Sequence, residues 1–227
     1  MKLAKHLLPV LCSSALIIQS QAGDNVLSVQ ANRPGIKISP TLYGIFFEEI
    51  NLAGDGGLYA ELIRNRSFED PKSMDHWSLL VEGSAKADVA SDQSRPLNFY
   101  NLTSAKVDIS QLEGGRVSLI NNGYWGIAVT GNASYRFSVA AKASAQYDGG
   151  LVVSIKNKNR ETIASGTVEK LTQNWKEYTL DLKANRTEAQ AQIEISFNKK
   201  GAVWLDMVSL FPSETWKGRS NGQHGSG

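Results

Sequence analysis

Apolar and polar residues alternate in many short runs across residues 67–211. Alternation with a period of two places successive side chains on opposite faces of a β-strand, so that one face can be buried. Turn-forming residues separate the runs at intervals of about eight to twelve positions, as in an all-β domain. The pattern predicts two packed antiparallel sheets in a jelly-roll-like β-sandwich, so the fold is mainly β. The clearest runs are Tyr135, Phe137, Val139 and Ala141; Leu151, Val153 and Ile155; Tyr178, Leu180 and Leu182; Ile193, Ile195 and Phe197; and residues 203–208.

A different pattern precedes this region. Residues 26–30 alternate like a short edge strand, whereas residues 42–50 are apolar at consecutive positions, which is typical of a strand buried on both faces. A glycine-rich stretch at 51–57 and a short predicted helix at 58–64 follow. Together these elements make one βα unit, which cannot bury its own faces without further partners.

The first 22 residues have the composition of a secretory signal. Lys2 and Lys5 precede an apolar stretch at 7–18, and small residues at positions 20 and 22 indicate cleavage near Ala22. We therefore expect a secreted or periplasmic protein. The apolar stretch is shorter than the roughly 20 residues that a membrane-spanning helix needs, so a membrane anchor is not expected.

Removal of this segment would change both the charge and the thiol content of the chain. The formal net charge of +2 would fall to zero, because two lysines and no acid are removed. A neutral chain is not suited to binding nucleic acid. Cys12 lies inside the segment, so no thiolate would remain as a nucleophile, a metal ligand or half of a disulfide.

Glu48 and Glu49 are the first carboxylates to consider for catalysis, because a glycosidase normally uses two carboxyl groups about 5 to 9 Å apart. Neighbouring residues on a strand point to opposite faces, so these two cannot form one catalytic pair. The three histidines, at positions 6, 76 and 224, suggest neither a metal cluster nor a Ser-His-Asp set. The residue pattern by itself therefore assigns no catalytic group.

Two parts of the chain resemble a known enzyme family. The first part contains LYGIFFEEI at 42–50, DGGLYAEL at 55–62 and NRSFE at 65–69, and the second begins at Asp206 with DMVSLFP. They resemble the opening of the α-L-arabinofuranosidases of glycoside hydrolase family 51, and the point where those enzymes re-enter their (β/α)8 barrel. The resemblance implies that residues 42–50 form the first barrel strand and that Glu48 hydrogen-bonds the arabinose at the cleavage subsite.

The same resemblance implies a reaction that this chain does not complete. The full-length family hydrolyses terminal non-reducing α-L-arabinofuranosyl residues in arabinoxylan and arabinan with retention, using two glutamates on later barrel strands. No residue of this chain matches either glutamate, so no catalytic residue is assigned. We therefore expect a truncated secreted arabinofuranosidase that is inactive by itself and binds an arabinose-containing plant polysaccharide, but neither nucleic acid nor a membrane.

The inserted region is similar to the carbohydrate-binding modules of families 4 and 9. That resemblance implies a structural calcium ion near Glu69 and Asp206, and no other cofactor is expected. Two carboxylates fall short of the six to eight oxygens that Ca²⁺ prefers. The adjacent Tyr124 and Trp125 cannot both be buried in one sheet face. We predict that Tyr124 contacts sugar and that Trp125 lies in the core.

Three more tryptophans, Trp77, Trp175 and Trp204, are in apolar contexts and are predicted to pack. The expected domains are a signal peptide at 1–22, an N-terminal strand with the incomplete barrel unit at 23–66, the carbohydrate-binding sandwich at 67–212 and a segment leading back to the barrel at 213–227. Two other hypotheses stay open: a stand-alone secreted carbohydrate-binding module, and a structural cell-surface sandwich without a ligand.

Overall fold

The computed structural model describes residues 27–33, 35–44, 46, 48, 50–72 and 74–218, which belong to two compact units. The first unit ends at Phe46. Its described residues form turns, such as the one closed by the hydrogen bond from Arg33 N to Gln30 O (3.1 Å), and include no helix or strand. The expected signal peptide at 1–22, with its cleavage site at Ala22, and residues 219–227 lie outside the described residues.

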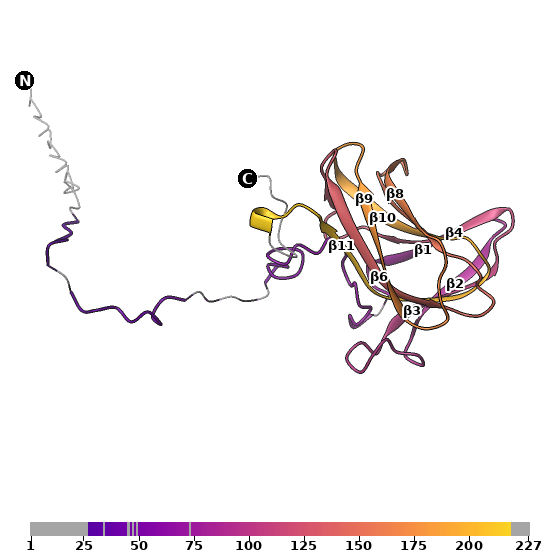
Figure 1. Cartoon of the computed structure of the whole chain (residues 1–227), viewed down its shortest axis with the longest axis horizontal. Helices are drawn as coiled ribbons and strands as arrows, with labels where there is room; N and C mark the ends of the chain where they lie inside the picture. Colours follow the sequence, from indigo (N-terminus) through magenta and orange to yellow (C-terminus); the bar gives the residue numbers. More distant parts are fainter. Residues whose placement is uncertain are drawn as a thin grey trace, which may run out of the picture. The chain divides into compact units, whose positions relative to one another are not determined.

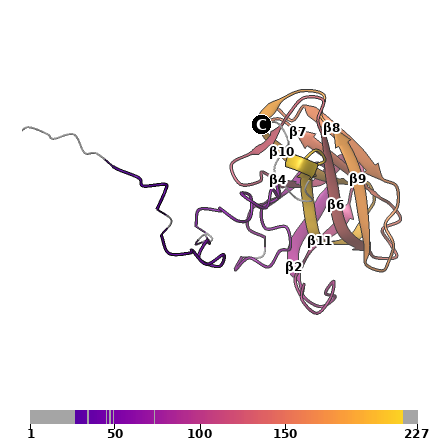
Figure 2. The same cartoon turned by 60° about the vertical axis from the view of Figure 1, so that its left-hand side comes forward.

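The second unit, which begins at Phe47, is a β-sandwich. One sheet has the strand order β1-β4-β10-β7-β8, with β5 paired to β10, and the other has the order β2-β3-β11-β6-β9. The two sheets face each other across the core (Figure 1; Figure 2). The strands are β1 (Trp77–Gly83), β2 (Lys86–Asp92), β3 (Ser104–Gln111), β4 (Gly115–Asn121), β5 (Ile127–Val129), β6 (Ser134–Ala143), β7 (Leu151–Lys156), β8 (Thr162–Val168), β9 (Lys176–Lys183), β10 (Glu188–Phe197) and β11 (Gly201–Pro212), followed by a short 3-10 helix, η1 (Trp216–Gly218).

The core lies between the sheets and is made by the alternating apolar residues. Phe137 and Val139 of β6, Leu119 of β4, and Ile193 and Ile195 of β10 are fully buried. Burial of each such side chain contributes about 1.5–3 kcal/mol, so the interior is the main source of stability. The predicted antiparallel sandwich is confirmed.

The segment before β1 is part of the sandwich. Strand β3 pairs with β11 only as far as Leu205, and residues 60–66 then lie beside the rest of β11. Leu62 N donates to Leu210 O (3.1 Å). Ile63 is fully buried in the core, although it precedes residue 67, where the sequence pattern places the start of the sandwich.

The predicted βα unit is not formed. Residues 58–64 are turn and extended chain, so the predicted helix is wrong, and none of the described residues within 26–30 or 42–50 lies in a strand. A buried parallel strand needs neighbouring strands on both sides to satisfy its backbone groups. Instead, Leu62 N donates to Leu210 O of β11, the backbone N and O of Arg64 bond the side-chain amide of Asn121 in β4, and Ile63 is buried. Within the described part of the chain, no helix is both long and apolar enough to span a membrane.

Candidate functional site

A groove of about 480 Å³ lies on the outer face of the β2-β3-β11-β6-β9 sheet. Its floor is formed by residues of β6, β9 and β11 that alternate with the core residues, and its walls by the segment at 59–66 and the loop between β2 and β3. Small-molecule sites typically occupy roughly 300–1,000 Å³. The groove is lined by Tyr59, Arg66, Leu97, Asn98, Arg136, Ser138, Ala140, Trp175, Lys176, Glu177, Met207, Ser209 and Phe211.

Trp175, just before β9, lines the groove with its indole ring. Its indole Nε1 donates to Arg95 O (3.2 Å), and Lys142 Nζ lies 4.7 Å from a ring centroid of Trp175. Burial and the nearby Arg95 lower the pKa of Lys142. These contacts hold the indole in place. Trp175 was predicted to be a packing residue, but it is only half-buried and lines the groove.

Arg66 and Tyr59 form a second wall, which is positioned by a buried carboxylate. Glu61 is almost fully buried, and its carboxylate accepts hydrogen bonds from Leu210 N (2.9 Å) and Ser209 Oγ (2.6 Å). Arg66 donates to the same carboxylate (3.3 Å) and to Tyr59 Oη (2.9 Å). Burial raises the pKa of Glu61. Sequence reasoning did not identify this set, since Ser209 and Leu210, which bond Glu61, lie almost 150 positions further along the chain.

Glu69 and Asp206, the predicted calcium ligands, are close enough to interact electrostatically. Asp206 is fully buried: Oδ1 accepts from Met207 N (2.6 Å), and Oδ2 has no hydrogen-bond partner among the described residues. Burial and the negative charge of Glu69 raise the pKa of Asp206 to about 7. Glu69 accepts two hydrogen bonds from Thr103, from its backbone N (2.7 Å) and its hydroxyl (3.0 Å).

This arrangement is compatible with a bound cation. A cation would neutralise the carboxylate pair and give the buried Oδ2 of Asp206 a partner. In the described part of the chain, three or more acidic, histidine or cysteine side chains do not gather at any one point. Backbone carbonyls, hydroxyls and water would therefore have to supply most of the coordinating oxygens.

The other predicted sugar contacts lie elsewhere. Glu48 is exposed on a segment without regular structure and does not line the groove. Tyr124 is half-buried, and its ring packs so closely on Gly56 that a Cβ there would lie 2.6 Å from it. Trp125 is 69% exposed, so its predicted core position is wrong. Trp77 and Trp204 were also predicted to pack, and both are buried.

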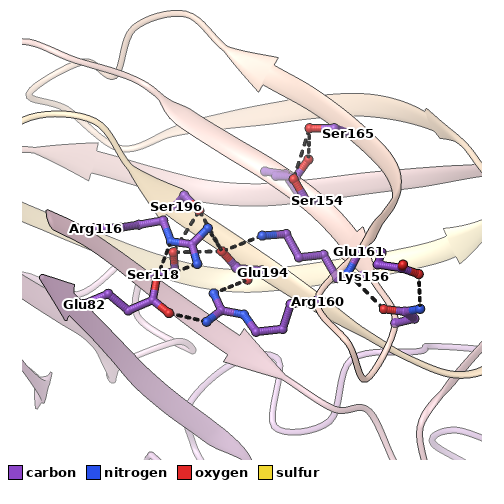
Figure 3. Close-up of polar contacts among 12 residues, drawn as sticks. Glu82, Arg116, Ser118, Ser154, Lys156, Arg160, Glu161, Ser165, Glu194 and Ser196 are labelled. Carbon is purple, nitrogen blue, oxygen red and sulfur yellow. Dashed lines mark hydrogen bonds and ion pairs between the residues drawn. The ribbon is translucent and has the colours of Figure 1, made fainter.

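A charged cluster occupies the outer face of the opposite sheet (Figure 3). Glu194 of β10 is fully buried and contacts Lys156 Nζ (2.9 Å), Arg116 (3.6 Å) and Arg160 (3.4 Å), and Glu82 contacts the same two arginines.

The cluster does not have the properties of a glycosidase acid/base pair. Burial opposes ionisation of Glu194, but Lys156 and Arg116 outweigh it, so its pKa is lowered. Arg160 and Arg116 lower the pKa of Glu82. Glycoside hydrolysis needs one carboxyl group that keeps its proton, and both of these are held ionised.

Several known proteins are similar to this chain. It is 32% identical over 210 residues to α-L-arabinofuranosidase 2 of Arabidopsis thaliana, a match that covers 86% of this chain and 31% of that protein. It is 34% identical over 207 residues to an extracellular exo-α-L-arabinofuranosidase of Streptomyces chartreusis, covering 88% of this chain and 23% of that protein. The chain thus spans a third or less of these curated relatives.

Structure and family comparisons agree with these matches. An arabinose-bound GH51 α-L-arabinofuranosidase superposes with a TM-score of 0.70 at 28% identity, over 81% of this chain and 31% of that one. Residues 60–201, which contain most of the sandwich, match the family model "Carbohydrate binding domain", which covers carbohydrate-binding modules of families 4 and 9. The chain therefore belongs to this carbohydrate-binding domain family.

Proposed function

We propose that this chain is the carbohydrate-binding part of an α-L-arabinofuranosidase and that it binds an arabinose-containing plant polysaccharide in the groove on the β2-β3-β11-β6-β9 sheet. The observation that carries the proposal is the groove itself, in which the ring of Trp175 lies among the polar side chains of Arg136, Ser138 and Asn98. Aromatic faces pack against the apolar faces of sugar rings, and polar side chains hydrogen-bond the hydroxyls.

Catalysis is proposed to require residues beyond those of this chain. The two glutamates that the family resemblance assigns to a retaining mechanism match no position here. The buried Glu194 and the partly exposed Glu82 are both held ionised by the neighbouring cations. Glu48 is proposed to contact arabinose only when a complete barrel surrounds it. We expect the chain by itself to release no arabinose from an aryl arabinofuranoside, and measurable turnover would contradict this division of roles.

Calcium is proposed to bind between Glu69 and Asp206, on the strength of the unpartnered Oδ2 of Asp206 and the raised pKa of that carboxyl group. The ion would have a structural role at this site. Secretion is proposed from the composition of residues 1–22, with cleavage near Ala22, and from the similarity to an extracellular relative.

A stand-alone binding module is the second candidate function. It is favoured by the fact that all described residues lining the groove lie from Tyr59 to Phe211. This described lining belongs to the unit that contains the sandwich. A structural cell-surface sandwich without a ligand has less support, because it leaves the groove unexplained.

Affinity gel electrophoresis in arabinoxylan tests the binding site. We expect Trp175→Ala to weaken the affinity derived from the retardation by about tenfold or more, since aromatic side chains that become buried on binding carry much of the binding free energy at such sites. Arg136→Ala is a second groove variant, and its side chain is 67% exposed, so the fold should be retained. Tyr100→Ala is the matched control, because Tyr100 is 87% exposed and does not line the groove. Equal retardation of all four proteins would exclude the groove as the binding site.

A further inference from the structure

Trp125 is unlike Trp77 and Trp204 because most of its side chain faces solvent. Its exposed fraction is 69%, against 8% for Trp77 and 6% for Trp204. It lies in the turn between β4 and β5, which is closed by the hydrogen bond from Gly126 N to Asn122 O (3.0 Å). The turn therefore presents a large aromatic ring at the surface.

The ring borders a depression of about 330 Å³, which we call the Trp125 depression. Three separate segments form it: the β4–β5 turn, the first half of β10, and the turn between β7 and β8. Among the described residues, an aromatic ring, three side-chain amides and one ammonium group line it, and no carboxylate does. The lining residues are Asn122, Trp125, Gly126, Lys158, Gln190, Ala191 and Gln192.

This combination of groups suits a sugar. A side-chain amide offers both donors and acceptors, so it can bond a hydroxyl in either sense. The indole supplies a flat apolar surface for the face of a sugar ring. The volume is at the lower end of the range for small-molecule sites, which fits one or two sugar residues.

The walls of the Trp125 depression are held in place on two sides. Gly126 has a φ of +97°, and a Cβ there would lie 2.9 Å from Gln190 Cα, so the β4–β5 turn packs directly on β10. The β7–β8 turn, which carries Lys158, is fastened by Arg160 to Glu82 and Glu194 (Figure 3). Preorganised walls lower the entropic cost of binding.

We propose that the Trp125 depression is a second carbohydrate-binding site, formed on the β1-β4-β10-β7-β8 sheet, whereas the groove is on the other sheet. A sugar residue stacks on Trp125, and the amides of Gln190 and Gln192 bond its hydroxyls. The proposal rests on the proposed function, because it takes the ligand to be a stretch of the same kind of polysaccharide that the groove binds.

The indole N–H signals of the tryptophans test both sites in one experiment. The ¹⁵N-labelled chain is titrated with oligosaccharides from arabinoxylan and, separately, from linear arabinan. Trp125→Phe and Trp175→Phe assign the two reporter signals, and the buried Trp77, whose Nε1 donates to Asn65 O (3.0 Å), serves as an internal control. We expect the signals of Trp125 and Trp175 to shift with sugar concentration while that of Trp77 stays unchanged.

The outcomes separate the two proposals. If only Trp175 responds, the second site is refuted and the proposed function stands. If only Trp125 responds, the second site stands and the groove is refuted as the binding site. If neither responds to either oligosaccharide, both proposals are refuted.

A variant measurement adds to the titration. Trp125→Ala should weaken binding at the Trp125 depression by about tenfold, read from the shifts of the Gln190 and Gln192 side-chain amides. Tyr100→Ala, which removes another exposed ring, should leave these shifts unchanged. Equal sugar affinity of Trp125→Ala and the wild type at these amides would show that the ring does not contact the ligand.

Discussion

Replacement of Asp206 by asparagine should stabilise the calcium-free protein at neutral and alkaline pH. Asp206 is fully buried, and its pKa is raised from the ordinary 3.8 to about 7. The shift is about 3 pKa units, and each unit corresponds to about 1.4 kcal/mol, so ionised Asp206 costs the folded state at most about 4 kcal/mol. Asparagine removes the charge and keeps the oxygen that accepts from Met207 N.

The sign of the pH dependence follows from the direction of the shift. Between about pH 4 and pH 7 the folded state still holds a proton that the unfolded state has released, so the free energy of unfolding falls as the pH rises. Below about pH 4 both states are protonated and Asp206 has no effect. The stability gain of Asp206→Asn should therefore be near zero at pH 4 and reach about 2–4 kcal/mol at pH 8.

Urea unfolding in EDTA at pH 4, 6 and 8, followed by tryptophan fluorescence, measures this difference. Asp181→Asn is the matched control, because the Asp181 side chain is 68% exposed. Added calcium should restore stability to the wild type, by about 2.7 kcal/mol at a hundred times its Kd, and should not stabilise Asp206→Asn to the same extent. If Asp206→Asn is no more stable than the wild type at pH 8 in EDTA, ionised Asp206 does not destabilise the calcium-free folded state and the reasoning is refuted. Equal stabilisation of both proteins by calcium would refute Asp206 as a calcium ligand.

Two further predictions concern the other buried carboxylates. Glu194→Gln leaves three cationic side chains without their buried partner and should lower the free energy of unfolding by about 3–5 kcal/mol at pH 7, against less than about 1 kcal/mol for the exposed Asp181→Asn. Because the pKa of Glu194 is lowered, this difference should be complete above about pH 4.5 and disappear as the pH falls through the folded-state pKa; a difference that does not depend on pH would contradict the ion-pair explanation. Glu61→Ala leaves Leu210 N and Ser209 Oγ without their acceptor and should cost about 3 kcal/mol in urea unfolding. An unchanged denaturation midpoint for Glu61→Ala would mean that residues 60–66 do not depend on that carboxylate to stay beside β11.

The strands of the sandwich could be predicted from the sequence because alternation along a strand is a local property. Phe137 and Val139 lie two positions apart, so their burial on one face of β6 follows from the geometry of an extended chain. The predictions of a buried strand at 42–50 and of a helix at 58–64 rested on other patterns, and the described residues of both ranges lie in neither element. An apolar run indicates that its side chains are buried, but it does not indicate which element they pack against. Ile63 is buried in the sandwich core, in the segment that lies beside β11.

The family resemblance predicted that Glu69 and Asp206 share a calcium site, but whether the two side chains lie close together depends on the tertiary structure. Oδ2 of Asp206 is buried without a hydrogen-bond partner among the described residues, and Glu69, far away in sequence, lies close enough to raise the pKa of Asp206. Likewise, Trp175 lies at the edge of an alternating strand, where the sequence does not distinguish a packing ring from a groove-lining ring. The difference depends on which loops and segments stand beside it.

The amino-acid sequence by itself therefore determined the mainly β architecture and the carbohydrate-binding family. Only the tertiary structure decided which side chains meet. It brought Tyr59, Arg66 and Trp175 into the lining of one groove, and it exposed Trp125 while Tyr124 packed on Gly56. The physical reason is that periodicity acts over a few residues, whereas the groove, the carboxylate pair and the Trp125 depression arise from pairing between strands that are distant in sequence.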